Sequence, residues 1–132
     1  MSLATTKLMR GYLVSSSAVI AKVPSRNIKV GWVKTTDSFP CITINQVTGT
    51  DIGFLGYNSS EAGSRMRRES ASIQIDIFSQ KDRLETIQIA DLIVPIMISG
   101  GCRKDSDFED YLDELNVYRK IQTYRIVKDY DD

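Results

Sequence analysis

The sequence predicts an α+β fold, a two-layer sandwich in which two helices cover one face of a mostly antiparallel four-stranded sheet. Two segments carry apolar residues at helical spacing, four alternate between apolar and polar residues, and turn-forming residues separate most of them. The expected order is α-β-β-(long loop)-β-α-β. The 132 residues, 42% of them hydrophobic, suit one domain and contain no evident linker, so we expect a single domain over residues 1–132.

The first helix is expected over residues 3–22, where apolar side chains recur at helical spacing. Three consecutive serines, residues 15–17, weaken its second half, and Pro24 ends it. The second helix is expected over residues 82–98, because Asp82 and Glu85 form a capping pair at its start. Pro95 should kink this helix or end it early.

The second helix is apolar around most of its circumference. One stripe consists of Leu84, Ile87, Val94 and Ile98. A second set widens it and consists of Ile89, Ile93 and Ile96. A helix this apolar is expected to lie on a sheet or in a contact between subunits.

Strands are expected over residues 28–34, 41–48, 69–79 and 116–128. In the third, isoleucines alternate with polar residues, which predicts one buried and one solvated face, with Asp76 at the surface. The fourth has apolar residues on both faces, as a central strand or one that touches a neighbouring subunit would. Residues 103–115 are acidic and are expected to be irregular, with one helical turn near Phe108.

The connection between the second and third strands, residues 49–66, is long and contains four glycines. It also carries apolar side chains that a purely solvated loop would not need, followed by a cluster of arginines. The arginines either contact phosphate or an acidic partner, or form the solvated start of a strand. The candidate partner-contact residues are Phe54, Leu55, Tyr57, Arg65, Arg67 and Arg68.

The residue patterns of common catalytic and metal sites are absent. There is no histidine, the usual general base and the commonest metal ligand. Of the two cysteines, Cys41 is expected in the core and Cys102 in a loop. The acidic residues between positions 107 and 114 lack the spacing of a calcium loop, and no phosphate-binding loop is found. We therefore expect no catalytic residue, no cofactor and no metal, in a structural or binding protein rather than an enzyme.

The charge and hydropathy of the chain narrow the range of partners. Lysine plus arginine and aspartate plus glutamate each number 17, so the formal net charge is zero. A neutral chain has no general attraction to nucleic acid and is compatible with self-association. The most apolar run, residues 87–98, is too short and too interrupted to span a bilayer, so we expect no membrane partner and a place in the cytoplasm or in an assembly built there.

Several segments resemble the small tail-completion proteins of tailed bacteriophages. Residues 39–50 are similar to that family's proline-led strand, which a glycine and a long loop follow. Residues 71–79 are similar to its alternating strand that ends in an aromatic residue, and a capped helix comes next in both. The chain then closes on a tyrosine-containing strand, residues 118–127, as in the family. The apolar, proline-containing second helix departs from the family's alanine-richer version.

The resemblance implies a tail terminator, a protein of the virion neck whose subunits form a ring, typically a homohexamer. Such a ring caps the tail tube protein and presents a surface to the head–tail connector, with DNA passing through its lumen only as cargo. The implied location is the virion, assembled in the host cytoplasm. The alternatives are another neck subunit, such as a head-closure or connector component, and a small nucleic-acid-binding module. The candidate subunit-interface residues are Ile89, Ile93, Ile96, Tyr118 and Tyr124.

Overall fold

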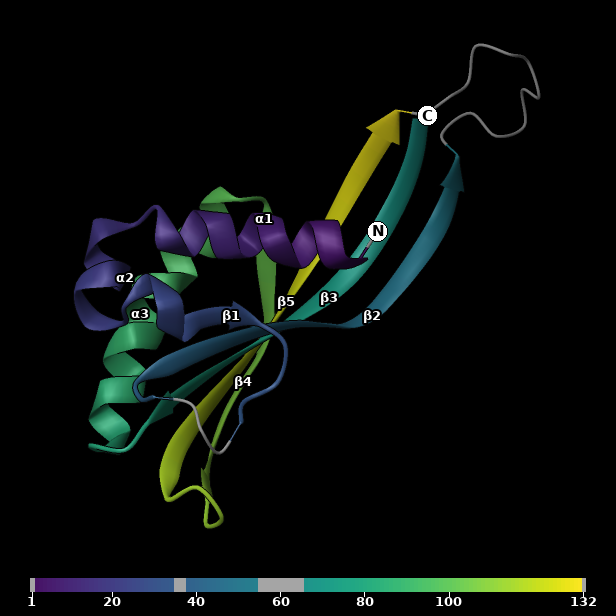
Figure 1. Cartoon of the computed structure of the whole chain (residues 1–132). Coiled ribbons are helices and arrows are strands. Elements are labelled where there is room, and N and C mark those ends of the chain that lie inside the picture. Colours follow the sequence, from purple (N-terminus) through teal and green to yellow (C-terminus); the bar gives the residue numbers. More distant parts are fainter. Residues whose placement is uncertain (1, 35–37, 55–65, 132) are drawn as a thin grey trace.

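The computed structural model describes residues 2–34, 38–54 and 66–131. Within these ranges five strands form one sheet, in the order β1-β2-β3-β5-β4. The strands are β1 (Ile28–Val30), β2 (Cys41–Phe54), β3 (Met66–Ser79), β4 (Cys102–Leu112) and β5 (Val117–Asp131). The helices α1 (Ser2–Val14), α2 (Ser17–Lys22) and α3 (Arg83–Ser99) lie together on one side of the sheet (Figure 1). The predicted α+β sandwich is confirmed, with one more strand than expected.

The sheet is antiparallel except at one edge. β2 pairs with β3, β3 with β5 and β5 with β4, all antiparallel. β1 instead runs parallel to β2, with Ile28 opposite Ile42. The chain that follows β1 must therefore return to the start of β2 before it can form the next strand. On the way, Val33 and Phe39 pack against buried residues of the sheet.

The segment predicted as one helix over residues 3–22 forms two. α1 ends at Val14, and Ser16 begins α2 by accepting a hydrogen bond on its side-chain oxygen from the backbone N–H of Val19. A 3-10 turn, Ser25–Asn27, then leads into β1. Serine competes for backbone hydrogen bonds better than it sustains a helix, which explains the break.

The second predicted helix is present as α3. The Asp82 carboxylate accepts a hydrogen bond from the backbone N–H of Glu85 at 2.8 Å, as the capping pair predicted. Of the two effects expected of Pro95, a kink or an early end, the early end does not occur, since α3 continues to Ser99. Pro95 lies on the exposed side of the helix, where water can satisfy the carbonyl that loses its partner. None of the helices described is long and apolar enough to cross a bilayer.

The strands differ in extent from the sequence-based prediction, and β1 ends at Val30 rather than at residue 34. The loop expected over residues 49–66 is partly strand, because β2 reaches Phe54 and β3 begins at Met66. Two register shifts, one between Gln46 and Thr48 and one between Asp51 and Gly53, let the glycine-containing segment stay paired. The segment 103–115, expected to be irregular, is mostly β4, which forms a hairpin with β5.

The three helices cover the sheet face from which Ile73, Ile75 and Ile77 project, and all three side chains are fully buried. From the helices, Met9 and Ile93 join the same apolar cluster. A smaller cluster occupies the opposite face, here called the open face. It consists of Cys41, Phe78 and Val117, with Val33, Phe39, Leu112 and Leu115 packed against them.

The sheet also extends beyond its helical cover. Figure 1 shows the far ends of β2, β3 and β5 running together past α1. Their backbones stay in register there, with Thr50 opposite Ser70 and Ser70 opposite Val127. These paired ends form a three-stranded arm that projects from the rest of the molecule.

Candidate interaction surfaces

The six residues predicted for the long loop divide between the arm and the segment beyond it. Phe54, Arg67 and Arg68 belong to strands, and Phe54 is the backbone partner of Arg67 in the β2–β3 ladder. Their assignment to a loop is wrong, because the ladder is longer than the apolar alternation suggests. Outside the described residues lie Leu55, Tyr57 and Arg65. The partner contacts expected of all six stay predictions.

For three of the five residues predicted for a subunit interface the assignment is wrong, because these residues belong to the core of the chain itself. Ile89 and Ile93 are fully buried where α3 faces the sheet. Tyr124 is fully buried too, and its hydroxyl donates to Oε1 of the buried Gln122 at 2.8 Å. Burial raises the pKa of Tyr124 above its ordinary value. None of these three side chains has accessible area to offer a neighbour.

The remaining two interface candidates are partly accessible. Ile96 packs partly against the core. Tyr118 is half-buried, and its ring meets that of Tyr111 edge-on with centroids 4.9 Å apart. Both tyrosines line a cavity of about 400 Å³ between the start of α3 and the β4–β5 hairpin. For Ile96 and Tyr118 the subunit contact stays a prediction.

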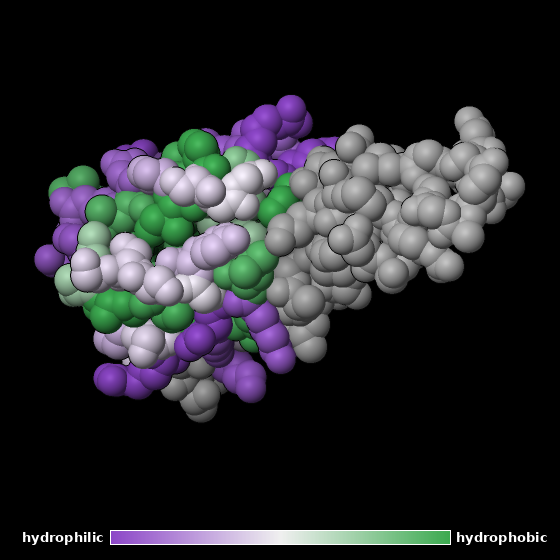
Figure 2. All heavy atoms as spheres, turned by 90° about the horizontal axis from the view of Figure 1, so that it is seen from above, coloured by the Kyte–Doolittle hydropathy of each residue, from purple (hydrophilic) through white to green (hydrophobic). Residues whose placement is uncertain are grey.

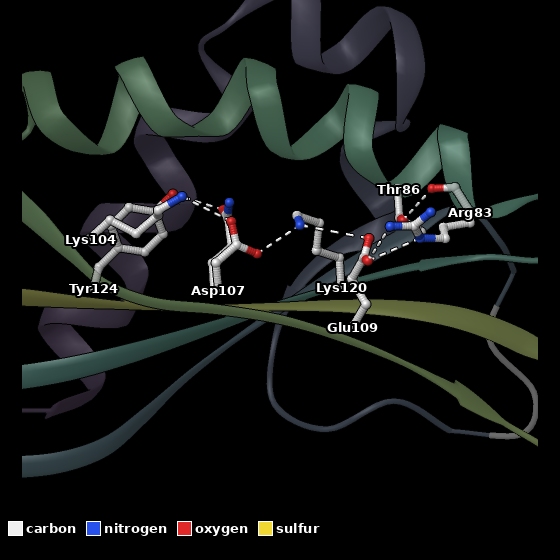
Figure 3. Close-up of polar contacts among 8 residues, drawn as sticks. Arg83, Thr86, Lys104, Asp107, Glu109, Lys120 and Tyr124 are labelled. Carbon is white, nitrogen blue, oxygen red and sulfur yellow. Dashed lines mark hydrogen bonds and ion pairs between the residues drawn. The ribbon is translucent and has the colours of Figure 1, made fainter.

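A chain of ion pairs joins the hairpin to α3 on the helix-covered face. Arg83 at the start of α3 pairs with Glu109 of β4, Nη2 to Oε2 at 2.7 Å. Lys120 of β5 pairs with Asp107 at 2.7 Å and lies 3.8 Å from Glu109. Lys104 completes the chain on Asp107 at 2.9 Å. Figure 3 shows these side chains between α3 and the hairpin; of the pairs, Arg83–Glu109 links the hairpin to the helix, and the others lie within the hairpin.

The open face carries a second charged group around Arg119. Its guanidinium binds the Asp110 carboxylate, with Nε at 2.8 Å from Oδ1, and this bond lowers the pKa of Asp110. Nη1 of the same arginine lies 3.8 Å from the carboxylate of Asp76, which also accepts from Nε2 of Gln74 at 2.8 Å. The prediction that Asp76 is at the surface is wrong, since it is 2% exposed. Burial raises its pKa, against the opposing effects of Gln74 and Arg119.

The acidic side chains of β4 are therefore largely paired with basic ones. Asp107, Glu109 and Asp110 each bind a basic side chain of β5, α3 or β4. Among the described residues no group of three or more potential ligands is arranged around a common point for a metal ion. Cys102 begins β4 and is buried, which corrects its predicted loop position. Cys41 lies in the core as predicted.

A second hollow lies between the ends of α1 and α3. It has a volume of about 370 Å³ and an apolar lining that includes Tyr12, Pro95 and Ile96. The Tyr12 ring packs directly on Gly100, where an added Cβ would come within 2.6 Å of it. Seen from above, the helical end of the subunit shows hydrophobic surface in several patches among polar ones (Figure 2). The surface of the helical layer therefore includes exposed hydrophobic residues as well as charged ones.

Comparison with known proteins finds similarity in structure but not in sequence. No protein-family model matches the chain, and no curated protein sequence is similar to it. Its fold is similar to that of a chain in the solved virion of the native gene transfer agent particle, with a TM-score of 0.64 and 7% sequence identity. The similarity covers 94% of this chain and 92% of that chain. At this identity the comparison establishes a shared fold, and it extends over nearly the whole of both chains.

Proposed function

We propose that this protein is a structural subunit of a virion and has no enzymatic activity. The observation that carries the proposal is the fold shared, over 94% of this chain, with a chain of the gene transfer agent virion. The independent resemblance of its segments to tail-completion proteins points the same way.

Within that class, the proposed role is a ring-forming tail terminator that caps the tail tube and meets the head–tail connector. A cap needs contacts with its own copies and with two different partners, which calls for several separate surfaces. The subunit offers the arm of β2, β3 and β5, the outer side of α3, and the open face of the sheet. The arm projects past the helices and so can extend over a neighbouring molecule.

The proposal is tested by measuring assembly and tube binding together. Native mass spectrometry of the purified chain, alone and with tail tube protein, should detect a ring of about six subunits. Electron microscopy should show that ring at the end of tubes and shorter tubes as more of it is added. A particle that stays monomeric at all concentrations and leaves tube growth unchanged would contradict the role.

The alternative role as another neck subunit is separated by the order of binding. A head-closure or connector component should bind portal complexes before any tube is present, whereas a terminator should bind assembled tubes. Pull-down of the chain with each partner alone distinguishes the two. Binding to DNA that falls steeply with salt would instead favour the nucleic-acid-binding reading.

A further inference from the structure

The outer side of α3 carries exposed apolar side chains although it faces away from the sheet. The residues that point outward at helical spacing are Leu84, Gln88, Asp91, Pro95 and Ile98, here called the α3 ridge. Leu84 is 57% exposed and Ile98 56% exposed. The ridge is about 21 Å long at 1.5 Å per residue. A helix packed on one side only normally carries charged residues along such a line.

The ridge contains a single ionisable side chain. Asp91 lies near its middle, is exposed, and has no ion-pair partner among the residues described. Its neighbour Gln88 accepts a hydrogen bond from Lys22 of α2 at 3.4 Å. The ridge therefore combines two exposed aliphatic ends with one negative charge between them.

The opposite side of the subunit carries a matching surface. Phe108 of β4 projects from the open face and is 58% exposed, beside its half-buried partner Ile121 on β5. Further along the same face Arg103 lies opposite Arg125. Here Phe108, Ile121, Arg103 and Arg125 are called the Phe108 surface.

The two arginines of the Phe108 surface share one carboxylate. Arg103 reaches Asp105 at 3.4 Å and Arg125 reaches it at 3.1 Å, with the arginine side chains 75% and 49% exposed. Two positive charges on one negative charge leave this end of the open face with a surplus positive charge. The Phe108 surface thus has an exposed aromatic ring and a positive charge, whereas the ridge has exposed aliphatic side chains and the negative charge of Asp91. The two surfaces are complementary in charge, and both are partly apolar.

From these two surfaces we infer that the α3 ridge of one copy docks on the Phe108 surface of a second copy of this chain. The two surfaces lie on opposite sides of the subunit, because α3 covers one face of the sheet and Phe108 projects from the other. Contact between them is head-to-tail, and such contacts form a closed ring when the rotation between copies closes. The inference deepens the proposed function, on which the ring rests, by naming the surfaces that join its subunits.

A symmetric contact of two ridges fits the charges less well. It would bring the Asp91 carboxylates of both copies toward each other, and Lys22, the cation beside them, already hydrogen-bonds Gln88 at 3.4 Å. The head-to-tail contact instead places each Asp91 near the surplus positive charge of Arg103 and Arg125. Apolar contact supplies the attraction in both arrangements, so the charges decide between them.

The test uses one variant blocked on each surface. The ridge variant carries Leu84→Lys and Ile98→Lys, and the Phe108-surface variant carries Phe108→Glu. Sedimentation velocity should show that each variant alone is largely monomeric where the parent chain assembles. An equal mixture should form a one-to-one dimer, because each variant retains the surface that the other lacks, and the dimer cannot grow further.

The matched controls separate lost contact from lost folding. Glu114→Lys places a lysine at an exposed hairpin position outside both surfaces and should assemble like the parent chain. Circular dichroism and thermal unfolding should show all variants folded. The charge swap Asp91→Lys with Arg125→Glu should recover assembly that Asp91→Lys alone weakens on the order of tenfold.

The outcomes distinguish this inference from the proposed function. Variants that assemble like the parent chain, a Phe108→Glu chain that still forms a dimer through its ridge, or a mixture that stays monomeric would each overturn the inference. Head-to-tail assembly that never binds a tube would contradict the tail-terminator role alone. Tube capping by a ring that ignores all three substitutions would contradict the inference alone.

Discussion

The two faces of β3 are buried to a similar extent by different means. On one face Ile73, Ile75 and Ile77 are fully buried beneath three helices. On the other, Asp76 and Phe78 are just as inaccessible, but their cover comes from the β1–β2 connection and from β5. The helix-covered face is held by apolar area, whereas the open face also depends on a charged group. The first should resist changes of pH and the second should not.

The largest effect is expected from a cavity in the helix-covered face. Ile75→Ala removes a fully buried side chain from the centre of the sheet and should lower the free energy of unfolding by about 2–5 kcal/mol. Urea denaturation followed by circular dichroism measures this. Leu84→Ala, on the exposed side of α3, is the matched control and should cost roughly 0.5 kcal/mol or less. Equal losses in the two variants would show that the apolar layer is not the main support.

A smaller loss is expected on the open face. Arg119→Met keeps most of the side-chain volume but removes the cation that binds Asp110 and faces the buried Asp76. Asp76 and Asp110 then lack their cation, which should lower the free energy of unfolding by about 1–3 kcal/mol near neutral pH. The same denaturation experiment measures it. Arg125→Met, whose side chain is 49% exposed, should change stability much less. An unchanged Arg119→Met protein would show that β5 does not support this face electrostatically.

The two carboxyls around Arg119 should respond to pH in opposite directions. Burial raises the pKa of Asp76 above 3.8, so its contribution to stability is full below that pH and is lost as pH rises through the folded value. The hydrogen bond from Arg119 lowers the pKa of Asp110, so its contribution is present above 3.8 and is lost as pH falls through the folded value. Relative to the parent chain, Asp76→Asn should therefore gain stability with rising pH.

Asp110→Asn should show the reverse trend. Its deficit against the parent chain should be largest near neutral pH and should disappear below the folded pKa of Asp110. Urea denaturation of the parent and both variants across this range gives the two difference curves. If the stability differences of both variants changed with pH in the same direction, the pKa of Asp76 would not be raised by burial while that of Asp110 is lowered by Arg119.

The smallest effect is expected from the ion pair at the start of α3. Arg83 binds Glu109 of β4, and this bond raises the pKa of Arg83 and lowers that of Glu109, but the arginine side chain is 65% exposed. Solvent and salt screen such a pair. Arg83→Met should leave the unfolding midpoint nearly unchanged, and high salt should reduce any difference. A loss comparable to that of Arg119→Met would show that the helix-covered face also depends on charge.

Sequence reasoning was most reliable where periodicity and capping agree. The alternation of β3 and the Asp82–Glu85 pair of α3 both appear in the structure as predicted. It was least reliable for β4, which is mostly exposed and charged and in which the few apolar residues show no regular alternation. These are Cys102, Phe108, Tyr111 and Leu112. A turn signal was present nonetheless. Asn116 takes a positive φ of 54° in the hairpin, a conformation that asparagine tolerates better than most residues.

For the candidate interaction residues, the sequence could not tell which apolar side chains lie in the core and which lie at the surface. The apolar character of α3 indicated both a core contact and a subunit contact, but it could not say which side served which. Burial assigns Ile89 and Ile93 to the core and leaves Leu84 and Ile98 exposed. Periodicity alone cannot distinguish two apolar stripes on one helix, because it carries no information on where the sheet lies.

By itself the sequence determined the α+β class, the place of the strongly periodic elements, and the lack of histidine-based chemistry, because spacing and composition are local properties. Tertiary structure alone decided the parallel edge at β1, the pairing of β4, the burial of Asp76 and the direction in which α3 turns its second apolar stripe. Each of these depends on which distant segment lies opposite. That choice is made by packing and charge pairing between residues far apart in the chain, such as Asp76 and Arg119.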